Sequence, residues 1–117
     1  MAALTILHNP RCGKSREALA LLESRGIAPR IVEYLKDPPS APELAAIVKK
    51  LGIAPEALVR KGEDVYKSKY AGRRLSDAEW IAAMVADPIL IERPIVIAGP
   101  KAVIGRPPAR VLELVDD

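Results

Sequence analysis

The chain has 117 residues, half of them apolar and 28% charged, a composition that supports a packed core and excludes a disordered chain. Its net charge of +3 favours small anions over nucleic acid as partners, because only 3% of the residues are aromatic and no basic run is uninterrupted. The apolar runs are far shorter than the about 20 residues that cross a bilayer. We therefore expect a single domain over residues 1–117, with no nucleic-acid or membrane partner.

Cysteine and histidine are each present once, as Cys12 and His8. A single cysteine cannot form a disulfide within the chain, which is usual for proteins of reducing compartments. The first residues run directly into a strand-like segment without a basic and apolar leader, so the cytoplasm is the expected location. One histidine and one cysteine are too few for a zinc site, and the acidic residues lack a ligand spacing, so no metal is predicted.

The first elements of the chain predict a strand, a helix and a second strand. Residues 4–7 form a short apolar run with β-branched members, and Asn9-Pro10 ends it. In residues 15–25 apolar side chains recur at helical spacing, and Gly26 stands where a C-terminal cap would. Residues 31–34 then predict a strand. This order favours a right-handed crossover between parallel strands, a βαβ unit.

A helical insertion is predicted next. Two serine–glutamate pairs form the capping-box pattern ahead of an apolar helical face; they are Ser40 with Glu43 and Ser76 with Glu79. The second of these helices should end near Asp87-Pro88. Residues 55–60 predict a short helix, whereas residues 61–74 are polar without a clear period and predict a loop-rich stretch.

The last part of the chain predicts two strands and a helix. Residues 94–98 and 102–104 are apolar β-type runs whose short separation suits an antiparallel hairpin. Pro107-Pro108 can open a final helix, whose apolar face would be Val111, Leu112 and Val115. The order βαβ, helical insertion, ββα predicts an α/β fold.

Cys12 lies in the loop between the first strand and the first helix, in an electropositive setting made by Arg11, Lys14 and Arg16. Cations and the free amides at a helix start favour thiolate over thiol. A buried structural cysteine would need apolar neighbours, which this loop lacks. We therefore hypothesise that the pKa of Cys12 is lowered and its sulfur reactive; the same loop could instead bind a phosphate through its amides.

The residues after Cys12 exclude several related chemistries. Ala18 stands where a Cys-x5-Arg phosphatase loop would place its arginine, and the nucleotide P-loop motif is missing. Ser15 stands where a Cys-x-x-Cys pair would place its second thiol. An intramolecular disulfide cannot form, so any resolving thiol must come from another molecule.

The segment His8-Asn9-Pro10-Arg11-Cys12-Gly13-Lys14-Ser15-Arg16 resembles the active-site loop of the glutaredoxin-linked arsenate reductases of the ArsC family. The resemblance covers essentially the full chain, since further segments follow in the family's order and spacing: Tyr34-Leu35, Pro38-Pro39, Leu58-Val59-Arg60-Lys61, Glu92-Arg93-Pro94-Ile95-Val96 and Gly105-Arg106-Pro107. The chain stops shortly after its last predicted helix, as in the shorter members of the family. The resemblance implies a thioredoxin-like fold with a mixed four-stranded sheet.

The resemblance also implies a reaction. Cys12 would attack arsenate while three arginines hold the oxyanion; these are Arg60, Arg93 and Arg106. Arginine suits the role because it stays charged and offers a planar fork of donors to a tetrahedral oxyanion. Glutathione is implied as the reducing co-substrate and glutaredoxin as the protein partner. No tightly bound cofactor is expected, and the expected state is a monomer.

Supporting roles near Cys12 are implied for His8, Asn9, Ser15, Arg16 and Pro94. Pro94 would be the cis-proline that thioredoxin-like folds place beside the active cysteine. His8 would influence the ionisation of the cysteine, or it would be a hydrogen-bonded structural residue. The Ser15 hydroxyl would bond the Cys12 thiolate, cap the first helix, or do both.

Two other functions stay open at this point. One is a general thiol reductase that acts on glutathione mixed disulfides. The other is a regulator like Spx, which shares this fold and binds RNA polymerase. Such regulators often sense oxidation through a paired thiol, so the Cys-x-x-Ser loop weakens the second reading.

Overall fold

The computed structural model describes residues 3–115, and the contacts within it divide the chain into two compact units. The first unit combines the described residues up to Asp37 with those from Arg93 onward, and the second is Pro38–Glu92. The second unit coincides with the predicted helical insertion between the βαβ and ββα segments.

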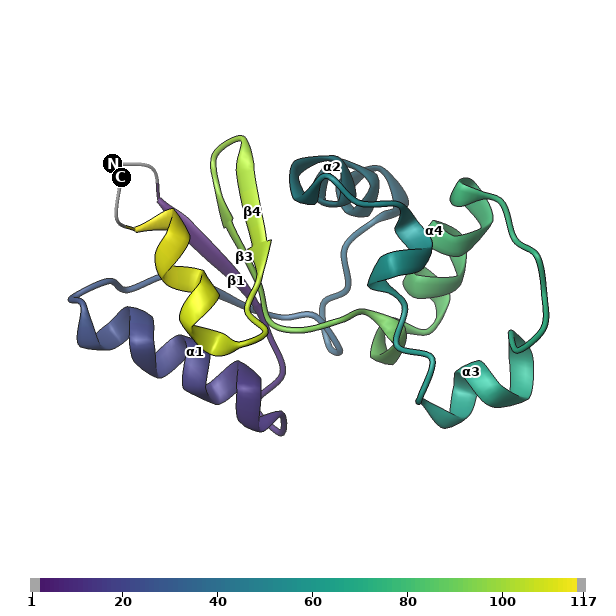
Figure 1. Cartoon of the computed structure of the whole chain (residues 1–117), viewed down its shortest axis with the longest axis horizontal. Coiled ribbons are helices and arrows are strands. Elements are labelled where there is room, and N and C mark those ends of the chain that lie inside the picture. The colour runs from purple at the N-terminus through teal and green to yellow at the C-terminus, as the bar shows by residue number, and fades with distance from the viewer. Residues whose placement is uncertain (1–2, 116–117) are drawn as a thin grey trace. The chain divides into compact units, whose positions relative to one another are not determined.

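The first unit is built on a four-stranded sheet with the strand order β2-β1-β3-β4 (Figure 1). The strands are β1 (Leu4–His8), β2 (Arg30–Glu33), β3 (Ile95–Ala98) and β4 (Lys101–Ile104). β1 pairs in parallel with β2 and antiparallel with β3, and β3 and β4 form the predicted antiparallel hairpin. The prediction of an α/β fold with a mixed four-stranded sheet is therefore confirmed.

Two helices cover one face of this sheet, α1 (Gly13–Ser24) and the 3₁₀ helix η3 (Pro108–Leu114) (Figure 1). Between them and the strands lies one apolar core, made of Leu4, Ile6, Ala18, Leu22, Val96, Val103, Val111 and Leu114. Gly26 follows α1 with a φ of +74°, a conformation that glycine adopts without a Cβ penalty, so the predicted C-terminal cap is confirmed. The predicted final helix exists, but as 3₁₀ turns.

The strand register decides which loops meet. Leu7 pairs with Ile95, and Ile95 pairs with Ile104. The residues that follow β1, precede β3 and follow β4 therefore lie at the same edge of the sheet. Three segments far apart in the sequence are brought together by antiparallel pairing alone.

The second unit is helical. Its elements are α2 (Ala41–Leu51), η1 (Pro55–Leu58), α3 (Asp64–Lys69), α4 (Asp77–Ala86) and η2 (Pro88–Leu90). Both capping boxes are confirmed: the Ser40 and Ser76 hydroxyls accept the amides of Glu43 and Glu79, whose carboxylates accept the serine amides. Each box satisfies donors that the first helical turn leaves without a partner.

Two elements of this unit differ in detail from their prediction. The loop-rich segment 61–74 also contains α3, which buries no residue and so has no apolar period to reveal it. Its anchors are the Tyr66 ring stacked on Trp80 and the Tyr70 hydroxyl, which donates to Asp87 at 2.8 Å. The helix predicted over residues 55–60 ends at Leu58, since the residues after it are extended and pair with another segment.

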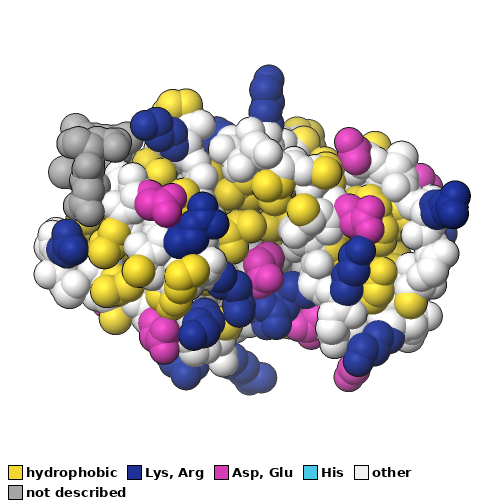
Figure 2. All heavy atoms as spheres, in the orientation of Figure 1, with side chains coloured by type: hydrophobic (Ala, Val, Ile, Leu, Met, Phe, Trp, Pro, Cys, Tyr) yellow, Lys and Arg dark blue, Asp and Glu magenta, His cyan; other side chains and the backbone are white. Residues whose placement is uncertain are grey.

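Charges of both signs are interspersed with apolar side chains on the face shown in Figure 2. Large apolar side chains exposed in the first unit are Ile31, at 47%, and Leu35, at 40%, on and just after the edge strand β2. Within residues 3–115, every helix is too short or too polar to cross a lipid bilayer.

Candidate active site

Cys12 is the N-terminal cap residue of α1, at the sheet edge where β1 ends. The turn before it is closed by the Cys12 amide, which donates to the Asn9 carbonyl at 3.0 Å, and its own carbonyl accepts from the Arg16 amide. The side chain makes no capping bond and is partly exposed. The sulfur thus lies at the free end of the helix, where the first amides face outward.

The pKa of Cys12 is lowered. Burial raises it, but the backbone amides of Ser15 and Lys14, the Arg93 side chain and the charge of Arg106 lower it more. Donors and positive charge around the sulfur stabilise the thiolate more than the thiol. The direction agrees with the sequence hypothesis.

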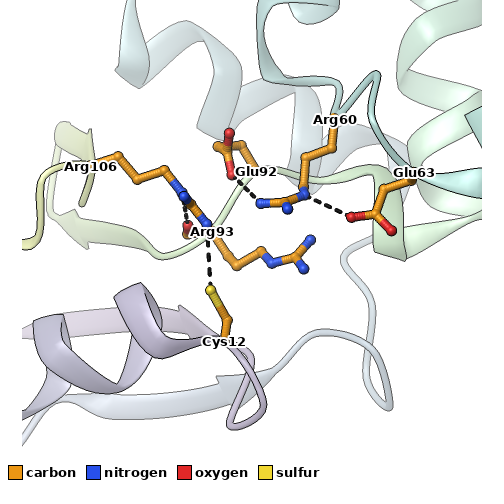
Figure 3. Close-up of polar contacts among 6 residues, drawn as sticks. All are labelled: Cys12, Arg60, Glu63, Glu92, Arg93 and Arg106. Atoms are coloured by element: carbon orange, nitrogen blue, oxygen red, sulfur yellow. Dashed lines mark hydrogen bonds and ion pairs between the residues drawn. The ribbon is translucent and has the colours of Figure 1, made fainter.

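Arg106 is the residue that contacts the sulfur directly. Its Nη2 donates to Cys12 Sγ at 3.4 Å, and its Nε donates to the backbone carbonyl of Arg93 at 2.8 Å (Figure 3). The carbonyl bond fixes the plane of the guanidinium, so that one edge of the fork faces the sulfur. Arg93 itself is 7% exposed, and its side chain also lowers the pKa of Cys12. Two arginines that flank the β3–β4 hairpin in the sequence therefore act on one sulfur.

The buried polar residues beside Cys12 organise its loop. Ser15 Oγ lies 2.6 Å from His8 Nδ1 and accepts the Asn9 amide at 3.1 Å. The Asn9 side-chain oxygen accepts the Arg11 amide at 3.0 Å. The Ser15 hydroxyl was predicted to bond the Cys12 thiolate, cap the first helix, or do both; in the structure it bonds His8 and accepts the Asn9 amide instead. The Ser15 backbone amide is one of the groups that lower the pKa of Cys12.

His8 reaches Cys12 through Ser15. Burial lowers its pKa, with the charge of Arg16 acting in the same direction and the carboxylates of Glu33 and Glu23 opposing it. The neutral imidazole can accept the Ser15 hydroxyl proton at Nδ1, which leaves that oxygen free to accept the Asn9 amide. His8 is thus a hydrogen-bonded residue that holds the helix start in place.

The cationic neighbours of Cys12 in the sequence have exposed side chains. Arg11, Lys14 and Arg16 all lie at the surface, and Arg16 Nη1 donates to the Pro10 carbonyl at 2.9 Å. These three residues were predicted to make the surroundings of Cys12 electropositive. In the structure the arginines that lower the pKa of Cys12 are Arg93 and Arg106.

Two cis peptide bonds flank the β3–β4 hairpin. Arg93–Pro94 is cis, as expected from the resemblance, and Arg106–Pro107 is cis as well, which the sequence analysis did not predict. Each cis bond directly follows an arginine that lowers the pKa of Cys12. The first unit thus brings together every predicted site residue except Arg60.

Arg60 belongs to the second unit, in the extended segment that follows η1. Its backbone amide donates to the Leu90 carbonyl at 2.7 Å, next to the bridge between Val59 and Ile91. Its Nε donates to Glu63 at 3.0 Å and its Nη1 to Glu92 at 2.8 Å (Figure 3). Burial lowers the pKa of Arg60, but the two carboxylates raise it more.

The two carboxylates that hold Arg60 were not predicted from the sequence. Glu63 could have been found from its i+3 spacing to Arg60, although outside a known helix that spacing is weak evidence. Glu92 lies 32 residues away and gives no local signal. Within residues 3–115, no three His, Cys, Asp or Glu side chains gather where they could hold a metal ion.

Comparison with known proteins places these features in a family. The ArsC family model matches residues 7–114. YfgD of Escherichia coli is 50% identical over 112 residues, 94% of each chain, and an arsenate reductase of Haemophilus influenzae is 50% identical over 114 residues, 96% of this chain and 98% of that one.

Solved structures agree. The arsenate reductase of Vibrio cholerae matches with a TM-score of 0.92 at 47% identity, over 97% of this chain and 98% of that one. A protein of Yersinia pestis, described as a putative arsenate reductase, matches with a TM-score of 0.88 at 49% identity, over 94% and 98%. The fold is thioredoxin-like, as in these neighbours. On sequence and structure together, the chain belongs to the ArsC family.

Proposed function

We propose that this protein is an arsenate reductase in which Cys12 is the nucleophile and Arg60, Arg93 and Arg106 bind the oxyanion. The observation that carries the proposal is the Cys12 sulfur, which lies at the start of α1 and accepts from Arg106 Nη2 at 3.4 Å. Its pKa is lowered further by the backbone amides at the helix start and by the Arg93 side chain. The same donors that stabilise a thiolate are suited to a tetrahedral oxyanion. The arsenate reductases among the relatives support arsenate as the substrate.

The reaction has three steps. The Cys12 thiolate attacks arsenic(V) and displaces one oxygen, which leaves as water after protonation. Glutathione then attacks the adduct; the two sulfurs become a mixed disulfide and lose two electrons, which reduce arsenic(V) to arsenite. A glutaredoxin thiolate finally attacks the glutathione sulfur of the mixed disulfide, so that Cys12 leaves as the thiolate and the glutathione becomes disulfide-bonded to glutaredoxin. An external thiol is needed because the chain has one cysteine.

The roles of the arginines differ in the proposal. Arg106 and Arg93 lower the pKa of the nucleophile before substrate arrives, and then neutralise charge on the oxyanion and the adduct. Arg60 is the third ligand and is held by Glu63 and Glu92 within its own unit. Pro94 and His8 have supporting roles. Pro94 lies directly before β3, and His8 holds the start of α1 through its bond to the Ser15 hydroxyl.

A turnover assay tests the mechanism. The full chain is incubated with arsenate, glutathione and glutaredoxin, each omitted in turn, and arsenite is measured. Wild-type protein should require all three additions, and Cys12→Ser should form no arsenite while keeping the thermal unfolding midpoint of the wild type. Arsenite formation by Cys12→Ser would refute the mechanism, and turnover of glutathione mixed disulfides without arsenate would favour the general thiol reductase.

A second series tests the oxyanion ligands. Arg60→Ala, Arg93→Ala and Arg106→Ala are compared with Arg110→Ala, whose exposed side chain pairs with Glu113. Each of the first three should raise the KM for arsenate by about tenfold or more, since each removes a charge-assisted donor, and Arg110→Ala should leave it unchanged. An unchanged KM in Arg60→Ala would remove Arg60 from the site.

A further inference from the structure

Gly105 directly follows β4 and precedes Arg106, and its surroundings leave no room for a side chain. A Cβ built on it would lie 2.7 Å from Pro94 Cγ, 3.0 Å from Val111 Cγ1 and 3.5 Å from Ala18 Cβ. The first two distances are shorter than carbon atoms tolerate without movement. Pro94 Cγ belongs to a ring fixed to the backbone, so it cannot turn aside as the end of a flexible side chain would.

The requirement for glycine at this position is spatial. The φ of Gly105 is not in the positive range, in contrast to Gly26, Gly52, Gly72 and Gly99. Alanine could therefore adopt the same backbone conformation, and only the approach of Pro94 and Val111 excludes it. Gly105 serves a close contact between two backbone segments.

That contact joins the two arginines at Cys12. The Gly105 amide donates to the Pro94 carbonyl at 2.8 Å, and the Arg106 amide donates to the Ile104 carbonyl at 2.9 Å, which turns the chain at Gly105. Arg106 Nε then donates to the Arg93 carbonyl. The segments Arg93–Pro94 and Gly105–Arg106 are thus bonded at two successive positions, and Arg106 Nη2 reaches the sulfur from this frame (Figure 3).

We propose that Gly105 is a positioning residue: without a side chain, it lets the end of β4 close on Pro94 and thereby sets the reach of Arg106 to the Cys12 sulfur. A side chain here would separate the two segments and break or lengthen the bond to the Arg93 carbonyl. Only the further consequence for arsenate binding rests on the proposed function; the effect on the sulfur does not.

The test is Gly105→Ala in the full chain, with the pH dependence of Cys12 alkylation by iodoacetamide as the readout. The pKa of Cys12 should rise by about one unit, since a donor and a positive charge move away, so that alkylation at a pH well below the pKa slows about tenfold. The KM for arsenate should rise in parallel. Alkylation needs no arsenate, so it gives an answer even if the proposed function is wrong.

Two comparisons separate positioning from packing. Gly62→Ala is the matched control, because a Cβ there meets nothing within 4 Å and the φ is not positive; Cys12 should titrate as in the wild type. Val111→Ala removes one of the two side chains that a Cβ at position 105 would meet, and it leaves the other, Pro94, in place. The double variant Gly105→Ala with Val111→Ala should therefore unfold at a higher temperature than Gly105→Ala and still have a raised Cys12 pKa.

Two outcomes overturn the proposal. If Gly105→Ala lowers the unfolding midpoint while Cys12 titrates as in the wild type, Gly105 is needed for packing alone. If the double variant restores the wild-type Cys12 pKa, contact with Val111 rather than with Pro94 is decisive. Should Gly105→Ala not fold, the double variant carries the same measurement, compared with Val111→Ala.

Discussion

The two units hold their arginines in different ways. In the first unit, Arg106 donates its Nε to a neutral backbone carbonyl and its Nη2 to the Cys12 sulfur. In the second unit, Arg60 donates its Nε and Nη1 to two carboxylates, and all three side chains are about one quarter exposed. A carbonyl orients a guanidinium, and a carboxylate orients it and also balances its charge.

This difference gives the two arginines different uses. The positive charge of Arg106 acts on Cys12 before substrate binds, which agrees with the lowered pKa of that thiol. The charge of Arg60 is balanced within its own unit, so its attraction for a distant anion is reduced. We therefore expect substitutions of Arg106 and Arg60 to differ in size and in kind.

The largest effect is expected for Arg106→Lys. Lysine keeps the charge, but its single ammonium cannot donate to the Arg93 carbonyl and to the sulfur in the fixed geometry of a planar fork, so kcat/KM for arsenate should fall about 100-fold. Arg60→Lys should lose only about tenfold, because its orientation is not set by the sulfur. Steady-state kinetics of both variants measure these losses. An equal or larger loss of kcat/KM in Arg60→Lys would contradict the different roles of the two arginines.

A smaller effect is expected for Glu92→Gln. The amide oxygen can still accept from Arg60 Nη1, but the negative charge is lost, so the KM for arsenate should fall about threefold as Arg60 becomes less compensated. Glu56→Gln is the control, because Glu56 pairs with the half-exposed Lys61. A rise in KM for Glu92→Gln alone would mean that the carboxylate mainly positions Arg60.

Ser76→Ala tests whether the second unit can be weakened without an effect on Cys12. It removes the hydroxyl that accepts the Glu79 amide at 3.2 Å, and loss of such a cap costs about 1 kcal/mol of unfolding free energy. Denaturant unfolding measures the loss, and the alkylation profile of Cys12 should stay unchanged. Ser68→Ala, which loses an exposed bond to the Val65 carbonyl, is the control and should be nearly neutral. A shifted Cys12 profile in Ser76→Ala would show that the cap of α4 affects the sulfur.

The smallest effect concerns pH and His8. Burial lowers the pKa of His8 below its ordinary value of 6.5, so in the window below 6.5 the unfolded chain binds more protons than the folded one. The free energy of unfolding should therefore decrease as the pH falls through 6.5 toward the folded pKa. His8→Asn should remove this part of the pH dependence in thermal unfolding curves; an unchanged slope would show that other groups cause it.

Local patterns in the sequence predicted most of the elements. Ser40 and Ser76 predicted the starts of their helices because a capping box involves only residues three apart in the chain. Gly26 predicted the end of α1, since a helix cap also depends on neighbouring residues only. The predicted hairpin also depends on a short connection. Local patterns did not reveal α3, which is held by Trp80 and Asp87 rather than by a periodic face of its own.

Of the candidate site, the sequence alone predicted Cys12 and its place at a helix start, since Cys12 and the amides of Lys14 and Ser15 are neighbours in the chain. The arginines were reached only through family resemblance. Tertiary structure decided which guanidinium touches the sulfur and how it is held, because the bonds from Arg106 to Cys12 and Arg93 span 94 and 13 residues. Pairing of β1, β3 and β4 creates such contacts, and no local spacing encodes them.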